Sequence, residues 1–191
     1  MKILVVGATG TIGAAVVRKL KARHAVVAVS RSSEIAVDIR DEHSIITMYD
    51  RIGSVDAVVC AAGGAPFVSL TEATPADFAR GFADKLGGQI NLVLHGLSHV
   101  SDGGSFTLIA GVLAREPIAT GAISSTVNGG VEAFVMAAAA ELPRGLRINA
   151  VSPSVITESM DKYGDFFPGF APVPVSEAAD AFVKSIEGIH T

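Results

Sequence analysis

The chain has 191 residues, of which 49% are hydrophobic and 18% charged, and its formal net charge is −4 at pH 7. This length suits one hydrophobic core, so residues 1–191 are expected to form a single domain. A negative balance excludes the basic surface that nucleic acid or an anionic membrane requires, and we expect a small-molecule ligand instead. Cys60 is the single cysteine, which excludes an internal disulfide and is typical of a reducing cytoplasm.

Short apolar runs alternate along the chain with longer amphipathic stretches, a pattern typical of a parallel sheet covered by helices. Strands are predicted at 2–6, 25–29, 35–39, 55–60, 104–110 and 146–152. Helices are predicted at 11–22, 42–52, 75–99, 120–141 and 176–187. Residues 153–175 contain four prolines and two glycines. We expect them to form an irregular loop over the carboxyl ends of the strands, where ligands bind in such folds.

The stretch GATGTIG, residues 7–13, follows the first predicted strand and opens the first predicted helix. Gly7 permits a tight turn, Gly10 lets a pyrophosphate approach the backbone, and Gly13 lets the helix pack closely on the strand. The N–H groups at the helix start are free to bind phosphate oxygens. A dinucleotide site is therefore predicted here, the alternative being a glycine-rich turn without a ligand. The candidate contacts are Gly7, Thr9, Gly10, Thr11 and Ile12.

The second strand ends in VSRSS, where NAD-binding proteins usually present an acidic residue to the ribose 2′-hydroxyl. Ser30, Arg31 and Ser32 offer hydroxyls and a guanidinium instead, which can hold a 2′-phosphate through charge-assisted hydrogen bonds. The sequence therefore favours NADP over NAD, and NADPH over NADH. The alternative is that Arg31 is an exposed loop cation without a ligand.

With these features the chain resembles the short-chain dehydrogenase/reductase superfamily, from the first strand to about residue 187. Three further stretches carry the resemblance: VDI at 37–39, CAAGG at 60–64 and RINAVSPSVITES at 147–159. It implies a Rossmann-type, doubly wound parallel α/β sheet of about six strands in the order 3-2-1-4-5-6, with helices on both faces. The cofactor contacts that it implies are Asp38, Ile39, Ala61, Ala62, Gly63, Val155 and Thr157. Ser154 departs from the glycine that the family usually has after the proline.

The stretches GGSFTLIAG and GAISSTVNGGVEAF keep the register of the family's active site but not its residues. In the family, a serine after the fifth strand and a Tyr-x-x-x-Lys sequence about a dozen residues later form the catalytic group. The matching positions here are Gly111, Ser124 and Asn128. An asparagine on the preceding helix, which supports the lysine in the family, corresponds to Lys85 in FADKLGGQINL.

These replacements change the acid–base chemistry that the resemblance implies. A tyrosine has a pKa of about 10, and a neighbouring ammonium lowers it so that the phenol exchanges a proton with a carbonyl oxygen. Ser124 is a far weaker acid, and the amide of Asn128 transfers no proton at neutral pH. Loss of a positioned acid typically costs a factor of roughly 10² to 10⁴ in rate, so we expect poor interconversion of alcohols and ketones. Hydride transfer stays possible because the nicotinamide supplies it.

Three side chains are candidates to replace the missing acid. Lys85 either places an ammonium in the vacated space or forms a surface salt bridge. His95 is expected to be a packed polar residue rather than a catalyst. Tyr163 either closes over a substrate or packs within the loop. Its aromatic neighbours in that loop are Phe166, Phe167 and Phe170.

Two function hypotheses from different classes follow. The first is an NADP-dependent oxidoreductase with an atypical active site, which reduces an acceptor that needs no tyrosine acid, such as a flavin, a quinone or an activated double bond. The second is a non-catalytic NADP sensor whose loop states signal to a partner. A scaffold that has lost cofactor binding is a third reading, which the intact GATGTIG stretch disfavours.

The mean hydropathy of +0.47 and the alanine- and glycine-rich helix at 120–141 favour self-association. In the resembled family this helix and the preceding one form a four-helix bundle across a two-fold axis. We therefore expect a homodimer or a higher homo-oligomer, with Phe134 and Ala138 at or beside the contact. The family usually adds a seventh strand after the last helix, and this sequence ends at Thr191, so we expect six strands.

Overall fold

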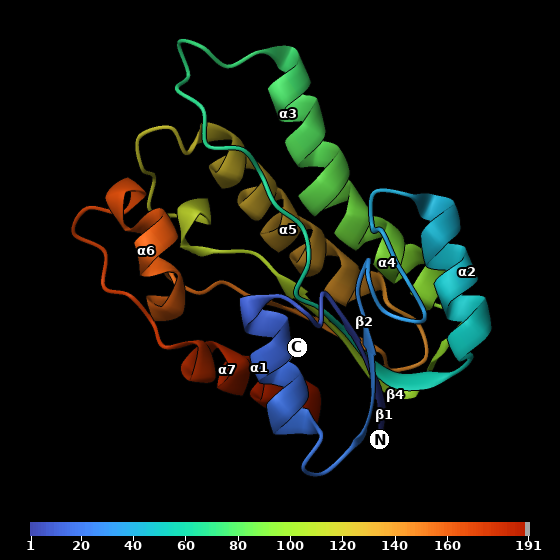
Figure 1. Cartoon of the computed structure of the whole chain (residues 1–191). Helices are drawn as coiled ribbons and strands as arrows, with labels where there is room; N and C mark the ends of the chain where they lie inside the picture. Colours follow the sequence, from blue (N-terminus) through green and yellow to red (C-terminus); the bar gives the residue numbers. More distant parts are fainter. Residues whose placement is uncertain (190–191) are drawn as a thin grey trace.

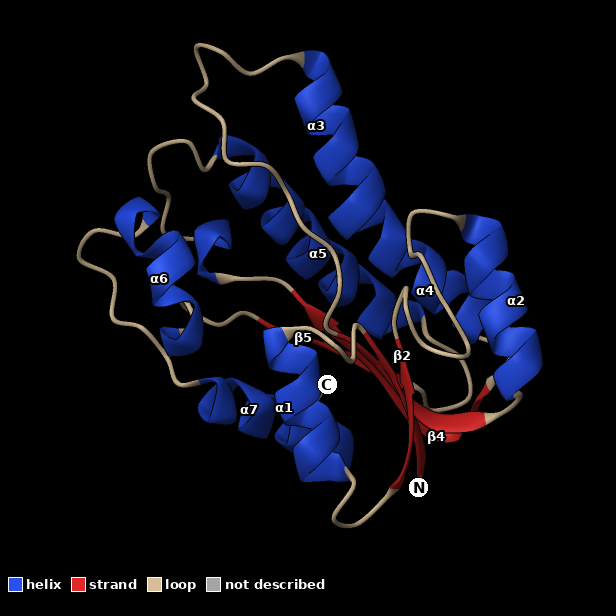
Figure 2. Ribbon diagram, in the orientation of Figure 1, coloured by secondary structure: helices blue, strands red, loops and turns tan. Residues whose placement is uncertain are grey.

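The computed structural model describes residues 1–189 and shows a parallel sheet between two layers of helices (Figures 1 and 2). The strands are β1 (Lys2–Val6), β2 (Ala25–Val29), β3 (Val55–Cys60), β4 (Val100–Ile109) and β5 (Arg147–Val151). They pair in the order β2-β1-β3-β4-β5, and all four pairings are parallel. The predicted α/β, doubly wound sheet is thus confirmed.

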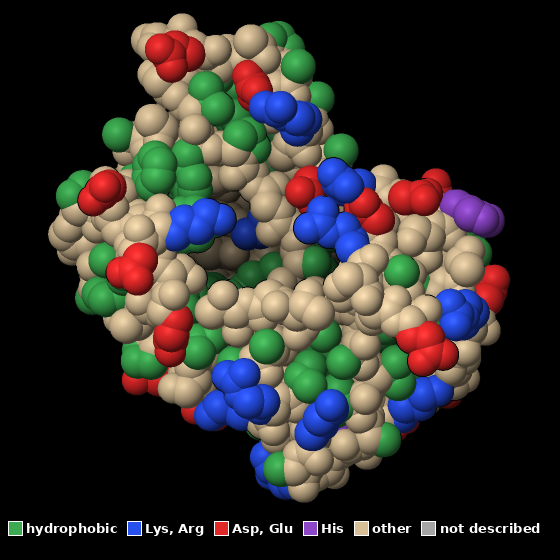
Figure 3. All heavy atoms as spheres, in the orientation of Figure 1, with side chains coloured by type: hydrophobic (Ala, Val, Ile, Leu, Met, Phe, Trp, Pro, Cys, Tyr) green, Lys and Arg blue, Asp and Glu red, His purple; other side chains and the backbone are tan. Residues whose placement is uncertain are grey.

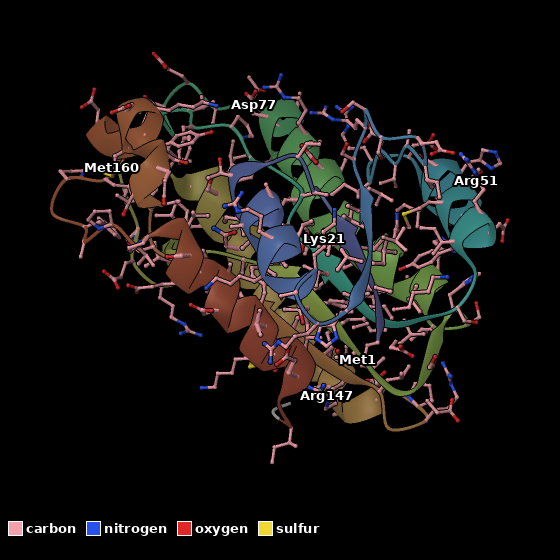
Figure 4. The ribbon with its side chains drawn as sticks, turned by 60° about the horizontal axis from the view of Figure 1, so that its bottom comes forward. Met1, Lys21, Arg51, Asp77, Arg147 and Met160 are labelled. Carbon is pink, nitrogen blue, oxygen red and sulfur yellow. The ribbon has the colours of Figure 1, made fainter. Side chains whose placement is uncertain are left out.

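Both faces of the sheet are covered by helices. The helices are α1 (Thr11–Leu20), α2 (Glu42–Ile52), α3 (Pro75–Gly81), α4 (Gly88–Gly96), α5 (Ala122–Glu141), α6 (Met160–Tyr163) and α7 (Val175–Glu187). Helices α1 and α7 lie side by side on one face, as Figure 4 shows, and their buried side chains pack against β1 and β3. Helices α2, α4 and α5 cover the other face of the sheet. Their buried side chains form a second hydrophobic core there with side chains from the strands.

The strand predicted at 35–39 is wrong, and the sheet has five strands rather than six. Only one isolated bridge forms there, between Ser30 and Ala36. After that bridge the backbone leaves the sheet edge, because the N–H of Asp38 bonds to the hydroxyl of Ser44 at 3.0 Å. The predicted order 3-2-1-4-5-6 therefore loses its first member, and the other five strands keep their order.

Two segments differ in secondary structure from the prediction: one helix is partly a π-helix, and one predicted loop contains helical turns. The helix predicted at 75–99 is helical from Pro75 to Gly96, but its middle, Phe82–Gly87, is a π-helix. The loop predicted at 153–175 contains helix α6 between two short 3₁₀ turns, Thr157–Ser159 and Gly164–Phe166. Prolines at the ends of this segment do not prevent single helical turns between them.

The turn between β1 and α1 brings backbone segments into direct contact. Gly7 has φ +84°, and a Cβ there would lie 2.7 Å from the carbonyl oxygen of Ala61. A Cβ on Gly13 would lie 2.1 Å from the carbonyl oxygen of Gly7. Glycine is therefore required at both positions, which is the packing role predicted for them.

We predict that Gly13→Ala destabilises the fold by at least about 1–3 kcal/mol, the usual cost of overpacking, because the clash is with backbone that cannot move aside. Gly129→Ala is the matched control, since Gly129 lies inside α5 and a Cβ there meets nothing within 4 Å. That change should stabilise by about 0.8–1.0 kcal/mol through helix propensity. Urea unfolding measures both, and equal midpoints for the two variants would contradict the prediction.

Candidate active site

Two cavities adjoin at the carboxyl ends of the strands, where Figure 3 shows a hollow with lysine or arginine side chains within it and on its rim. The first, here called the glycine groove, has a volume of about 570 Å³. The second, the Lys85 pocket, has a volume of about 340 Å³. Both are lined by Ala61, Gly63 and Gly64, so the groove opens into the pocket along the segment after β3.

The glycine groove collects most of the predicted cofactor contacts. Its lining includes Gly7, Thr9, Gly10, Ser30, Arg31, Ser32, Asp38, Ile39, Ala61, Ala62 and Gly63. Thr11 and Ile12 line the Lys85 pocket instead, and so does Val155. Thr157 lines neither cavity; its N–H bonds to the carbonyl oxygen of Val173 at 2.9 Å, which holds the loop after β5. The structure thus brings together every predicted cofactor contact except Thr157.

Arg40 is a groove residue that sequence reasoning missed. Its Nε donates to Oδ1 of Asp38 at 2.9 Å and its Nη2 to Oδ2 at 2.5 Å. These hydrogen bonds lower the pKa of Asp38 to about 2, so the carboxylate is ionised and held by Arg40 at neutral pH. Arg31 also lines the groove, is exposed, and takes part in none of the ion pairs of residues 1–189. Arg31 is therefore available to a ligand.

The serines on either side of Arg31 form a compact turn. The hydroxyl of Ser33 accepts from the N–H of Ser30 at 2.8 Å, and the hydroxyl of Ser30 accepts from the N–H of Ser32 at 3.2 Å. Ser30 is buried and Ser32 is exposed at the groove. This turn holds backbone and hydroxyl groups at the end of β2, beside Arg31.

The Lys85 pocket gathers the four predicted active-site positions. Gly111 follows β4, Ser124 and Asn128 lie one turn apart near the start of α5, and Lys85 comes from the π-helix; all four line the pocket. Ser124 and Asn128 are buried, at 6% and 4% exposure. A spacing of four residues places both on one face of the helix. π-helical turns are frequent at functional sites.

The side chain of Lys85 is partly buried in this pocket, and the surface salt bridge considered from the sequence is wrong. Its Nζ donates to the carbonyl oxygen of Ala110 at 2.9 Å, and none of the ion pairs of residues 1–189 involves it. Burial lowers the pKa of Lys85 to about 8, although Asp84 acts in the opposite direction. The nearby thiol of Cys60 is also buried, which raises its pKa to about 12 and keeps it neutral.

Asn128 carries a polar atom without a partner. Its Oδ1 is buried and accepts no hydrogen bond within the described chain. A Cβ on Gly111 would lie 3.2 Å from its Nδ2, so the amide fills the space next to Gly111. A buried acceptor without a donor is costly, and Asn128 is one of the residues that line the Lys85 pocket.

Gln89 is a supporting residue that the sequence did not single out. Its side chain is fully buried, donates to the carbonyl oxygen of Ile109 and accepts from the N–H of Ile109, both at 2.9 Å. This pair of bonds anchors the end of β4 to the helix that carries Lys85. A glutamine four residues after Lys85, on the same helix face, was the signal available in the sequence.

Aromatic side chains form one wall of the pocket. Tyr163 and Phe167 line it, together with Phe67, which sequence reasoning missed. Phe67 stacks on Phe166 with ring centroids 5.0 Å apart, and Phe167 meets Phe170 edge to face at 5.4 Å. The predicted aromatic cluster therefore exists and packs over the pocket.

His95 is not part of either cavity. It pairs with Glu42 at 2.9 Å on the outside of α4, as expected for a packed polar residue. Within residues 1–189 no group of three or more His, Cys, Asp or Glu side chains could hold a metal ion. No helix of that part of the chain is long and apolar enough to cross a membrane.

A glycine turn at a helix start, on the carboxyl edge of a parallel sheet, defines the class of Rossmann-type dinucleotide-binding folds. Residues 6–172 match the family model of enoyl-(acyl carrier protein) reductase. The chain belongs to this family, within the short-chain dehydrogenase/reductase superfamily, and the predicted resemblance is confirmed.

Known relatives agree with this assignment. The chain is similar to the protein lin1944 from Listeria innocua, with 49% identity, a TM-score of 0.98, and coverage of 100% of this chain and 96% of that one. A small-chain dehydrogenase in complex with NADPH is 26% identical, with a TM-score of 0.89 and coverage of 100% and 93%. Trihydroxynaphthalene reductase from Colletotrichum orbiculare is 24% identical over 169 residues, which are 84% of this chain. The match spans 60% of that reductase's length.

The lowered pKa of Lys85 predicts a pH dependence of stability. Below pH 8 both the folded and the unfolded chain hold the proton; between about pH 8 and 10.5 the folded chain has released it and the unfolded chain has not. The unfolded state then binds more protons, so stability rises with pH in this window, by an amount on the order of 1–3 kcal/mol. Lys85→Met should remove this rise in urea unfolding, and identical pH slopes for both proteins would contradict it.

Proposed function

We propose that the protein is an NADPH-dependent oxidoreductase with an atypical active site, which reduces a small organic acceptor. One observation carries the proposal: the glycine groove opens directly into the Lys85 pocket along Ala61, Gly63 and Gly64. If a dinucleotide bound with its pyrophosphate on the GATGTIG turn, the adjoining pocket would be available to its nicotinamide end. Family membership and a relative bound to NADPH support this reading.

The residues present fit such a cofactor. Gly7 and Gly10 line the groove with backbone at the start of α1, and Arg31 is free to bind an anion. The unpartnered Oδ1 of Asn128 can accept a hydrogen bond from a hydroxyl of a ligand. NADPH supplies a hydride when bound. The chain's own residues bind and orient, exclude water through the aromatic cluster, and keep one ammonium beside the acceptor.

The second candidate is a non-catalytic NADP sensor. What favours it is that Gly111, Ser124 and Asn128 provide no group that ionises near neutral pH. Such a protein would bind the cofactor in the same groove. Binding would alter the conformation of loop 153–175, and no substrate would be converted.

A single-turnover assay separates the two candidates. Protein in excess over NADPH is mixed with menadione, 2-cyclohexenone or flavin mononucleotide, and absorbance of the reduced nicotinamide is followed. The oxidoreductase should consume NADPH faster than the same mixture without protein. Unchanged absorbance with all three acceptors, together with tight binding of NADPH in calorimetry, would favour the sensor instead.

Cofactor preference gives a second prediction. Arg31→Ala should weaken NADPH by about 1.5–3 kcal/mol, the range for hydrogen bonds to a charged group, and leave NADH nearly unchanged. Arg31 is the groove guanidinium with no ion pair in the described chain, whereas Arg40 is held by Asp38. Arg18→Ala, in the exposed last turn of α1, is the matched control. Isothermal titration with both cofactors measures this, and equal losses for the two would refute the proposed 2′-phosphate contact.

We also propose that the protein is at least a dimer through α4 and α5. Leu94 on α4 is 54% exposed and Met136 on α5 is 72% exposed. Phe134 and Ala138 are partly buried and pack on the core, so they lie beside this surface rather than at its centre. Exposed apolar side chains on adjoining helices typically mark an interface.

Light scattering should give at least twice the mass of one chain at micromolar concentration. Met136→Glu should shift the mass toward the monomer, because a carboxylate would be buried without a partner. A monomer mass for the unaltered protein would overturn the proposed dimer.

A further inference from the structure

We propose that Lys85 is a catalytic residue of this protein: its ammonium donates a proton to the oxygen of a small conjugated carbonyl compound as that oxygen becomes negative. The inference rests on the proposed function, because the hydride comes from the reduced nicotinamide. It names both a residue and a substrate class for the pocket.

The position of the ammonium is the first support. Lys85 reaches the pocket from the π-helix, and its hydrogen bond to Ala110 places Nζ next to Gly111, at the end of β4. An ammonium has three donors, and one is used by Ala110. The others have no carboxylate among the ion pairs of residues 1–189.

The backbone is shaped to bring Lys85 there. A Cβ on Gly63 would lie 2.9 Å from the Cα of Lys85, so the segment after β3 allows the helix to approach only because residue 63 is glycine. Gln89 ties the same helix to Ile109 with two hydrogen bonds. The ammonium is therefore positioned by rigid elements on both sides, as a catalytic group requires.

The charges around the pocket leave Lys85 as its dominant electrostatic feature. Lys85 and Tyr163 are the titratable side chains that line it, and Tyr163 comes from α6 on the opposite side. Cys60 on β3 is neutral, and Asp84 lines the glycine groove rather than the pocket. A negative charge that develops on a substrate oxygen is stabilised by such a positioned ammonium.

The acidity of Lys85 suits proton donation. Burial holds its pKa at about 8, so the group is charged at neutral pH and yields its proton far more readily than an exposed lysine. Proton donors are most effective when their pKa lies near the working pH. The neutral side chains of Ser124 and Asn128 cannot take this role, but Asn128 can accept a hydrogen bond through its free Oδ1.

The step balances without a further reactant. A hydride forms a C–H bond at the carbonyl carbon, or at the β-carbon of an enone, and the nicotinamide is oxidised by two electrons. The C=O π pair moves to the oxygen, directly or through the conjugated system. An N–H bond of Lys85 breaks as the O–H bond forms, leaving a neutral amine that regains a proton from solvent water.

The lining favours a flat, uncharged acceptor. Phe67, Tyr163 and Phe167 present aromatic faces and edges, and the volume of about 340 Å³ suits a small ring system. Conjugation spreads the charge that arrives with the hydride before the proton follows. Quinones and cyclic enones have both properties.

Two variants test charge and proton donation separately. Lys85→Met removes both, whereas Lys85→Arg keeps the charge but cannot lose a proton at accessible pH. With NADPH and 2-cyclohexenone, Lys85→Met should lower turnover at least about 100-fold. The rate of the unaltered protein should fall above about pH 8, where Lys85 loses its proton, and the rate of Lys85→Arg should show no such fall. Lys21→Met, at the exposed end of α1, is the matched control and should leave the rate unchanged.

A binding measurement tests the oxyanion site without turnover. In the presence of NADP⁺, the unaltered protein should bind 4-nitrophenolate at least tenfold more tightly than Lys85→Met, as measured by the shift of its absorbance. NADPH affinity within twofold for both proteins shows that the groove is intact. Equal phenolate binding by the two would overturn the role of Lys85, as would loss of turnover in Tyr163→Phe but not in Lys85→Met.

The outcomes distinguish failure of the proposed function from failure of the role of Lys85 alone. If Lys85-dependent phenolate binding occurs but no acceptor oxidises NADPH, the oxidoreductase function is wrong and Lys85 forms an anion site only, so its catalytic role falls as well. If NADPH is oxidised at equal rates by Lys85→Met and the unaltered protein, the function stands and the role of Lys85 is refuted.

Discussion

The contact between the Gly7–Gly13 turn and the segment after β3 is the constraint on which the rest of the site depends. Gly7 lies against Ala61, and Gly13 lies against Gly7 itself, at distances that exclude any side chain. This contact sets where α1 begins and how the segment 61–64 leaves the sheet. Because that segment lines both cavities, the same backbone contact determines the floor of the groove and the wall of the pocket.

A second constraint is the cost of burying one ammonium. In the resembled family, an asparagine amide lies on the helix before β4 and a lysine ammonium on the helix after it. Here the two groups are exchanged: Lys85 lies before β4 and Asn128 after it. The pocket thus keeps one charged group and one amide. Position 124 holds a serine instead of the family's catalytic tyrosine. Desolvation makes Lys85 costly to bury and also lowers its pKa. The same burial therefore links the stability of the fold to the proposed proton donation.

The sequence-based predictions succeeded where the local pattern and the tertiary environment agree. Strands β1, β2 and β3 and helix α2 begin and end where the apolar pattern places them, and Asp41 caps the start of α2 by accepting from the N–H of His43. The predicted strand at 35–39 failed because hydrogen bonds of Asp38 to Ser44 and Arg40 compete with the sheet edge. Arg40 was missed for a related reason: nothing in a single sequence shows that a guanidinium two residues from a carboxylate will turn into the groove.

The sequence by itself determined the order of the elements, the glycine turn and the list of residues at the carboxyl edge, because apolar periodicity and glycine positions are local properties of the chain. Only the tertiary structure decided that Lys85 lies partly buried in the pocket without a carboxylate partner and that the Oδ1 of Asn128 has no donor. Burial and hydrogen bonding at these atoms depend on segments far apart in the sequence, from β3, β4, the π-helix and α5. The lowered pKa of Lys85 and the unpaired acceptor of Asn128 arise from that packing, which residue type alone does not specify.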